Sequence, residues 1–371
     1  MGRGRRVRVL VTTMWDTLVG QSRAVDVLQH AIARPVHAYL LVGPTGSGVE
    51  DAARCLAIGL IGGADDERVA QLVFRRMHPD VVELEPEGTF FLARQADDVI
   101  EEAMRSPVEG ERKVIILREI ERMNETSANR LLKTFEEPPA RTVFVLTTSM
   151  PDEVLPTIRS RCQRIDFEPV ATEQLEAVLR GEGVDDDSAQ LAASLSGGQL
   201  ARARALAGPM AQVRRVFAEA PSRVDGTGAT AVAVAADLDA AVNEAVAEVT
   251  ERHREELSAF EADMERLGYQ PREAQRMRRR IEERQKRESV RARRDLLLEG
   301  VTAMECTYRD ALAGPGHSIN ADLPVLSVTP RGAVAALEAC RAAREAFLLH
   351  EKGVVRLQYL LMSLPPARPT S

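Results

Sequence analysis

The stretch Ala38-Tyr39-Leu40-Leu41-Val42-Gly43-Pro44-Thr45-Gly46-Ser47-Gly48 decides the fold of this chain. It is a short apolar run followed directly by a glycine-rich turn, an order typical of the P-loop that joins a buried strand to a helix. The next two positions of a P-loop hold a lysine and a serine or threonine, which reach the phosphates and Mg²⁺. This chain has Val49 and Glu50 there, and a carboxylate repels a polyphosphate. We therefore predict a degenerate, non-functional nucleotide site at three glycines, Gly43, Gly46 and Gly48.

A second apolar run, residues 114–117, indicates the same loss. In an ATPase, such a strand ends in an aspartate that helps to hold Mg²⁺. Here Arg118 stands at that position, and Glu119 stands where a second acid commonly follows. A guanidinium has only hydrogen-bond donors, so it cannot coordinate a cation. We therefore expect no ATP hydrolysis by this chain alone.

The composition is that of an ordinary globular protein. Of the 371 residues 44% are apolar and 28% are charged, and the length suffices for two or three domains. The net charge of −7 argues against a protein that coats nucleic acid by itself. No apolar run is long enough to cross a membrane, and residues 2–8 are basic without the other features of a secretory signal. We expect a cytoplasmic protein in which residues 1–13 are an extension and Met14 is the physiological start.

The four cysteines are scattered along the chain and form no metal-binding pattern. They include no C-x-x-C pair and have no paired histidines, whereas a zinc site needs four converging ligands. We expect free thiols, no metal and no other cofactor. The cysteines are Cys55, Cys162, Cys306 and Cys340.

The pattern along the chain predicts three folded regions between two disordered ends, residues 1–13 and 365–371. Residues 14–168 alternate apolar strands with amphipathic helices, as a parallel α/β sheet does. Residues 169–208 read as a small helical unit. Residues 209–364 are rich in Ala, Glu and Arg, and we expect them to be all-helical.

Apolar spacing, proline and glycine set the expected elements. Strands are predicted at 38–42, 80–84, 113–117, 143–148 and 163–167. Helices are predicted at 21–33, 49–60, 96–105, 124–136, 152–158 and 173–180, and at 194–207 with a break at Gly197-Gly198. In the third region several helices are expected, separated at Pro221, Gly268, Pro271, Gly314-Pro315-Gly316 and Pro324.

Three further segments make a family resemblance specific. They are Trp15-Asp16-Thr17-Leu18-Val19-Gly20-Gln21, Asn129-Arg130-Leu131-Leu132-Lys133-Thr134-Phe135-Glu136-Glu137-Pro138-Pro139 and Ile158-Arg159-Ser160-Arg161-Cys162. Together with the degenerate P-loop, they resemble the delta prime family of clamp loader subunits of bacterial DNA polymerase III, over residues 14–208. Many members of that family carry a cysteine-rich zinc module near residues 62–78, and this chain departs from them there because only Cys55 lies nearby.

The resemblance implies a fold and a function. The fold is an α/β AAA+ P-loop core with a parallel sheet, a small helical lid and an all-α C-terminal collar for oligomerisation. The function is that of a non-hydrolysing clamp loader subunit, which assembles with the delta subunit and the ATP-hydrolysing tau/gamma subunits. Within a DNA polymerase holoenzyme, that complex loads the sliding clamp onto primer-template DNA, with no membrane involved.

The resemblance also implies functional residues. Arg161 would be an arginine finger that acts in trans on the nucleotide of a neighbouring subunit, as the catalytic residue of this chain. The expected interface comprises Ser160, Arg161, Cys162, Lys133 and Glu137. Thr148 stands at a sensor-1 position, where a structural hydroxyl is an equal alternative. Arg202 resembles a sensor-2 residue only loosely, and an ordinary surface arginine is favoured there.

Other interpretations stay open beside these. Arg161 could be a solvated arginine, and Lys133 and Glu137 could form a weak surface pair. The arginine-rich run 272–294 is typical of a solvated helix face, with contact to DNA phosphates or an acidic partner as the alternative. The rival functions are an autonomous AAA+ ATPase that acts on DNA, which nucleotide turnover would reveal, and a DNA-binding module.

Overall fold

Two compact units follow one another along the chain, the first ending at Arg204 and the second beginning at Ala205. The computed structural model describes residues 14–366 apart from residues 16, 65, 88–89, 268–270, 315–317, 321 and 350–352. Each unit has its own hydrophobic core. The predicted disordered extension, residues 1–13, and residues 367–371 of the predicted tail lie outside the described residues.

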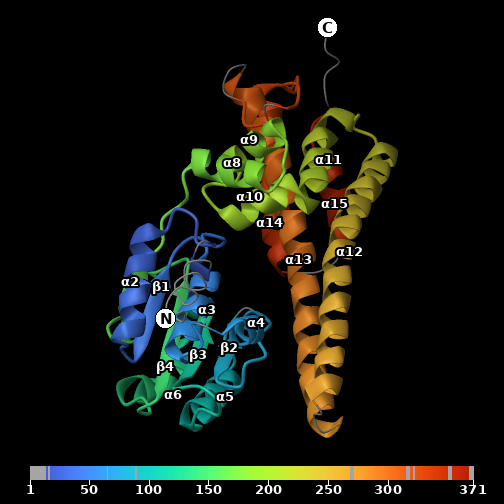
Figure 1. Cartoon of the computed structure of the whole chain (residues 1–371). Helices are drawn as coiled ribbons and strands as arrows, with labels where there is room; N and C mark the ends of the chain where they lie inside the picture. Colours follow the sequence, from blue (N-terminus) through green and yellow to red (C-terminus); the bar gives the residue numbers. More distant parts are fainter. Residues whose placement is uncertain are drawn as a thin grey trace. The chain divides into compact units, whose positions relative to one another are not determined.

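A five-stranded parallel sheet forms the centre of the first unit, in the order β2-β3-β4-β1-β5 (Figure 1). The strands are β1 Ala38–Val42, β2 Val81–Leu84, β3 Lys113–Leu117, β4 Thr142–Thr148 and β5 Gln163–Asp166. In β1, Leu40 is paired with Leu146 of β4 on one side and with Arg164 of β5 on the other. The predicted parallel α/β core is confirmed, and each predicted strand lies within one residue of its expected bounds.

Helices cover both faces of this sheet, because successive residues of a strand point to opposite sides. Tyr39 and Leu41 pack in one core with Leu56 of α3, whereas Leu40 packs in the other with Leu131 of α6. The helices of this α/β part are α2 Ser22–Ala33, α3 Val49–Leu60, α4 Glu67–Phe74, α5 Ala93–Met104, α6 Glu125–Glu136 and α7 Pro156–Arg159, with the 3₁₀ helix η1 Ile120–Arg122.

Three of these helices differ from the sequence-based expectation. The helix α7 begins at Pro156, four residues after the predicted start at residue 152, because proline is favoured at the first position of a helix. The helix α4 was not predicted, and it begins after Asp66, whose carboxylate accepts the backbone N–H of Arg68 at 2.9 Å. The helix α5 begins three residues earlier than predicted, and Gln95 Oε1 accepts the backbone N–H of Leu92 at 3.0 Å there. The start of α4 and the start of α5 are each fixed by a polar side chain, Asp66 and Gln95, and apolar spacing does not detect such residues.

Three short helices complete the first part of the chain: α8 Thr172–Gly181, α9 Asp186–Leu195 and α10 Leu200–Ala207. The break predicted at Gly197-Gly198 is confirmed, because α10 begins only at Leu200, but the helix before it, α9, begins at Asp186 rather than at residue 194. Gly197 and Gly198 separate them with φ of +63° and +80°, values that side-chain-bearing residues rarely adopt. A Cβ on Gly198 would also lie 2.5 Å from Pro169 Cβ, so the turn requires glycine for its packing as well.

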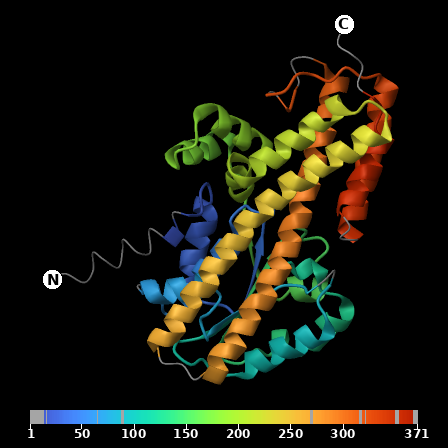
Figure 2. The same cartoon turned by 90° about the vertical axis from the view of Figure 1, so that its right-hand side faces the viewer.

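The second unit is all-helical, as predicted, with α11 Pro209–Arg223, α12 Gly228–Leu267, α13 Pro271–Ala313, α14 Pro330–Leu349 and α15 Gly353–Ser363. The two longest, α12 and α13 of 40 and 43 residues, lie side by side as a hairpin (Figure 2). The break predicted at Pro221 comes two residues later, because Pro221 lies in the last turn of α11, which ends at Arg223. The next helix, α12, begins at Gly228.

None of the described helices is both long and apolar enough to cross a membrane. The predicted boundaries between a core, a lid and a collar, at residues 168/169 and 208/209, stay a prediction.

Substitution of Gly300 by alanine should destabilise the second unit. Alanine favours a helix interior over glycine by about 1 kcal/mol. At this position, however, the new Cβ would lie 2.6 Å from the ring of Phe217, which is fully buried. Overpacking of this kind costs about 1–3 kcal/mol, so we expect a net loss of stability in urea unfolding. Gly181→Ala is the control, because no atom lies within 4 Å of its new Cβ. Equal stability of the two variants would contradict the packing described here.

Candidate functional site

The turn between β1 and α3 keeps the backbone geometry of a P-loop. The Gly43 N–H donates to the Thr148 carbonyl of β4 at 3.1 Å, and the Ser47 N–H donates to the Pro44 carbonyl at 3.0 Å. Gly46 and Gly48 have φ of +82° and +94°, so both positions favour glycine. The three predicted glycines are thus brought together in one turn at the end of β1.

The residue at the lysine position of this turn packs inward. The side chain of Val49 is 3% exposed and belongs to the core on one face of the sheet, with Leu18 and Phe167. A Cβ built on Gly43 would lie 2.8 Å from Val49 Cγ2 and 2.7 Å from Ser47 Oγ, which shows how tightly the turn is filled. No cationic group is therefore available at the first residue of α3 to meet a phosphate.

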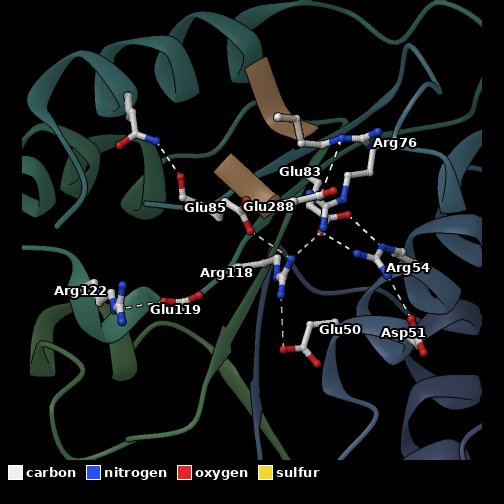
Figure 3. A network of polar contacts seen from close by, with 12 residues as sticks. Glu50, Asp51, Arg54, Arg76, Glu83, Glu85, Arg118, Glu119, Arg122 and Glu288 are labelled. Atoms are coloured by element: carbon white, nitrogen blue, oxygen red, sulfur yellow. Dashed lines mark hydrogen bonds and ion pairs between the residues drawn. The ribbon is translucent and has the colours of Figure 1, made fainter. Parts of the chain in front are cut away.

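The two substituted positions of the metal site meet in an ion pair. Arg118, at the end of β3, places Nη2 3.6 Å from Glu50 Oε1 in the first turn of α3 (Figure 3). Its Nη1 lies 3.1 Å from Glu85 Oε2 and 3.5 Å from Glu83 Oε1. Residues that hold Mg²⁺ in an ATPase are thus replaced here by a cation and an anion that neutralise each other.

Glu83 of β2 is the buried centre of this network, with a side chain only 4% exposed. Arg54 of α3 donates two hydrogen bonds to this carboxylate, from Nη2 at 2.8 Å and from Nε at 2.9 Å. Arg76 Nη2 approaches the same carboxylate at 3.0 Å (Figure 3). Burial raises the pKa of Glu83, but Arg54, Arg76 and Arg118 outweigh burial and hold this pKa below its usual range. The carboxylate is therefore ionised at neutral pH.

The cluster of Glu83 with Arg54, Arg76 and Arg118 was not predicted from the sequence. The signal was a glutamate inside the short apolar strand β2, where a side chain without a partner would be costly. Its partners Arg54 and Arg76 come from a helix and a turn, and spacing along the chain does not link them to the strand. Glu119, the predicted second acid, instead has φ of +52° and pairs with Arg122 at 3.0 Å.

Arg161 lies immediately after α7 and before β5, with its side chain 33% exposed. Nη1 donates to the Thr157 carbonyl at 2.8 Å, and Nη2 lies 2.5 Å from Glu136 Oε1. Ser160 Oγ also donates to Thr157, at 3.4 Å. The Cys162 side chain packs against the core, and burial raises the pKa of its thiol to about 12. Ser160 is thus exposed and Arg161 partly exposed, whereas Cys162 has a packing role.

The other predicted residues are spread over the first unit. Lys133 and Glu137 are exposed on and after α6, and the structure contains no ion pair between these two described residues. Thr148 is 3% exposed and its Oγ1 accepts the Met150 N–H at 3.0 Å, as a structural hydroxyl would. Arg202 lies on α10 and is partly buried. Of these residues, Thr148 contacts the glycine turn, because its backbone carbonyl accepts the Gly43 N–H.

Residues 62–78, where the zinc module was expected to be absent, contain α4 and the buried His78, whose Nδ1 accepts the Asp80 N–H at 3.1 Å. Across the part of the chain that the structure describes, no group of three or more His, Cys, Asp or Glu side chains is placed to hold a metal ion. The absence of zinc stays a prediction that elemental analysis of untagged protein would test.

The five-stranded parallel sheet and the glycine turn after β1 form an α/β core of the P-loop type. Residues 20–171 match the family model described as DNA polymerase III, delta subunit. The chain is 34% identical to DNA polymerase III subunit delta' of Bacillus subtilis over 47% of its own length and 56% of that protein. It is 35% identical to the subunit delta' of Pseudomonas aeruginosa, over 53% of this chain and 60% of that one.

DNA polymerase III subunit tau of Bacillus subtilis is 28% identical, over 54% of this chain and 38% of that protein. The chain therefore spans little more than half the length of the delta' relatives that it matches. Its similarity to subunits delta' of bacterial DNA polymerase III agrees with the resemblance that the sequence motifs predicted.

Substitution of Glu83 by glutamine should destabilise the first unit by about 3–5 kcal/mol at neutral pH, because three arginines lose their shared anion. A carboxyl group whose pKa is lower in the folded state than in the unfolded state stabilises the folded state at pH values above its unfolded pKa, about 4.3 for glutamate. This stabilisation is lost as the pH falls toward the pKa of the folded state. The gap between wild type and variant in urea unfolding should therefore narrow below about pH 4.

Glu137→Gln is the matched control, because Glu137 is exposed and should lose little stability. A wild-type-to-Glu83→Gln gap that stays constant from neutral pH to strongly acidic pH would contradict the ionised state of this carboxylate.

Proposed function

We propose that this chain is a non-hydrolysing subunit of the bacterial DNA polymerase III clamp loader. The observation that carries the proposal is the pairing of Glu50 with Arg118, which fills both metal-binding positions with groups that neutralise each other. In addition, Val49 stands at the position of the P-loop lysine and is buried, so no cation there can bind the phosphates of a nucleotide. The likeness to delta' proteins supports the assignment to this complex, because those relatives are named as subunits of DNA polymerase III.

We further propose that the chain assembles with the ATP-hydrolysing tau/gamma subunits and the delta subunit in the cytoplasm, and meets the sliding clamp and primer-template DNA through that complex. The last helix supports assembly. Val355, Tyr359 and Met362 of α15 are 65%, 72% and 58% exposed, and their spacing puts them on one face. The opposite face of α15 is buried in the core. An apolar face of this kind suits a helix of a neighbouring subunit, as a collar domain over 209–364 requires.

In this proposal, Arg161 is an arginine finger that reaches a neighbouring subunit's nucleotide, and Ser160, Cys162, Lys133 and Glu137 belong to the same interface. Two observations support it. The guanidinium is one-third exposed, and it contacts the Thr157 carbonyl, Ser160 Oγ and the half-exposed carboxylate of Glu136. An exposed ion pair of this kind contributes about 0–1 kcal/mol, so a phosphate could displace it at little cost.

Arg161→Ala should leave the subunit folded and able to assemble, but slow the ATPase of the reconstituted complex. Loss of a positioned guanidinium costs about 10³–10⁵ in rate at the one site that it serves. The bulk rate should therefore fall modestly while clamp loading falls further. Arg161→Lys should rescue poorly, because an ammonium cannot make the forked contact with phosphate oxygens.

The matched control is Arg159→Ala, two residues away on α7, where the side chain is 41% exposed and faces Asp152 at 3.6 Å. This variant should keep wild-type activity. Unchanged ATPase and loading in a fully assembled Arg161→Ala complex would remove Arg161 from the proposed role.

A further inference from the structure

The hairpin of α12 and α13 carries an uneven distribution of charge. Residues 271–294, the first half of α13, contain eleven basic and four acidic residues, a net charge of +7 in a chain whose total is −7. The run contains no aromatic residue. A strongly basic helix segment inside an acidic protein requires either internal partners or an external anion.

Part of this run has internal partners within the hairpin. Arg278 lies 2.7 Å from Glu261 of α12 and 2.9 Å from Glu282 of its own helix. Arg284 pairs with Glu256, and Gln285 Nε2 donates to the same carboxyl group at 2.9 Å. These contacts face α12, and they hold the two helices together.

A second set of basic residues has a different environment. It consists of Arg276, Arg279, Lys286 and Arg287, which we call the basic stripe. All four side chains are exposed, and the structure gives none of them an ion-pair partner among the residues it describes. Their spacing puts them on one face of α13, away from the buried residues Ile281 and Gln285.

The acid on this face does not neutralise the basic stripe. Glu283 stands four residues from both Arg279 and Arg287, a spacing at which helical ion pairs commonly form. It makes no ion pair with either. The stripe therefore presents four cations, unpaired among the side chains that the structure describes, along about 16 Å of helix, at 1.5 Å per residue. Over that length, duplex DNA presents about ten phosphate charges.

The composition of the stripe favours DNA over a protein partner. Protein interfaces have a core that is depleted in charge and enriched in aromatic residues, methionine and arginine. No apolar side chain is exposed between Arg276 and Arg287, and Val290, 45% exposed, comes only beyond the stripe. Long cationic side chains without aromatic neighbours suit contact with phosphates and give no means of stacking on bases.

We infer that the basic stripe of α13 binds the phosphate backbone of duplex DNA without regard to sequence. This binding site lies apart from the degenerate nucleotide site and does not depend on the clamp loader proposal. It gives the chain a direct contact with DNA in addition to any that a complex supplies.

The test measures binding of the full chain to a fluorescent duplex of about thirty base pairs, by anisotropy between about 50 and 200 mM salt. One variant replaces the four stripe residues together: Arg276→Gln, Arg279→Gln, Lys286→Gln and Arg287→Gln. Each lost phosphate contact removes about 0.9 from the slope of log K against log salt. We expect the slope to fall by about 3 to 4 and the affinity at low salt to fall more than tenfold.

The matched control makes the same change of charge at four exposed arginines elsewhere in the second unit: Arg215→Gln, Arg309→Gln, Arg331→Gln and Arg341→Gln. It should retain the slope and most of the affinity, and circular dichroism should show both variants to be equally helical. Absence of DNA binding by the wild type, as expected if the stripe serves an acidic protein instead, would overturn the inference. Equal losses in the two variants would do the same, because net charge alone would then explain binding.

Discussion

The rest of the candidate site depends on one buried carboxylate, that of Glu83, which three arginines share. An ion 4% exposed would be too costly without such partners, and the arginines in turn could not gather without the anion. One of the three, Arg118, also reaches Glu50 at the start of α3. The cluster therefore ties β2, β3 and α3 together at the place where an ATPase would hold phosphate and Mg²⁺.

The turn between β1 and α3 has the glycine backbone of a P-loop, whereas the side chains around it pack against one another. The glycine turn keeps φ values that only glycine adopts easily, and β1 still pairs with β4 at Thr148. The polar groups, in contrast, are directed at one another or into the core. Side chains accessible to a partner lie elsewhere, at Arg161 after α7 and on the exposed face of α15. This distribution is consistent with the proposed role as a non-hydrolysing subunit.

The sequence predicted the sheet well, because its strands are short apolar runs that end at glycine, proline or charged residues. The loss of the nucleotide site, inferred from the fixed positions of a P-loop, stays a prediction. Sequence-based prediction missed α4, whose start depends on Asp66, and the Glu83 cluster, whose partners come from separate segments. It could not divide the arginines of α13 into paired and unpaired sets. That division requires the register of α13 against α12, which places Arg278 beside Glu261 and leaves Arg279 exposed.

The most direct test of a closed nucleotide site is equilibrium binding of Mg·ATP to the purified full chain, by calorimetry up to millimolar concentration. Inward-packed Val49 and the Glu50–Arg118 pair predict no saturable binding of ATP or ADP. Stoichiometric binding that is lost when Gly46 is replaced by a bulky residue would contradict the closed site, because nucleotide would then occupy this chain's own loop.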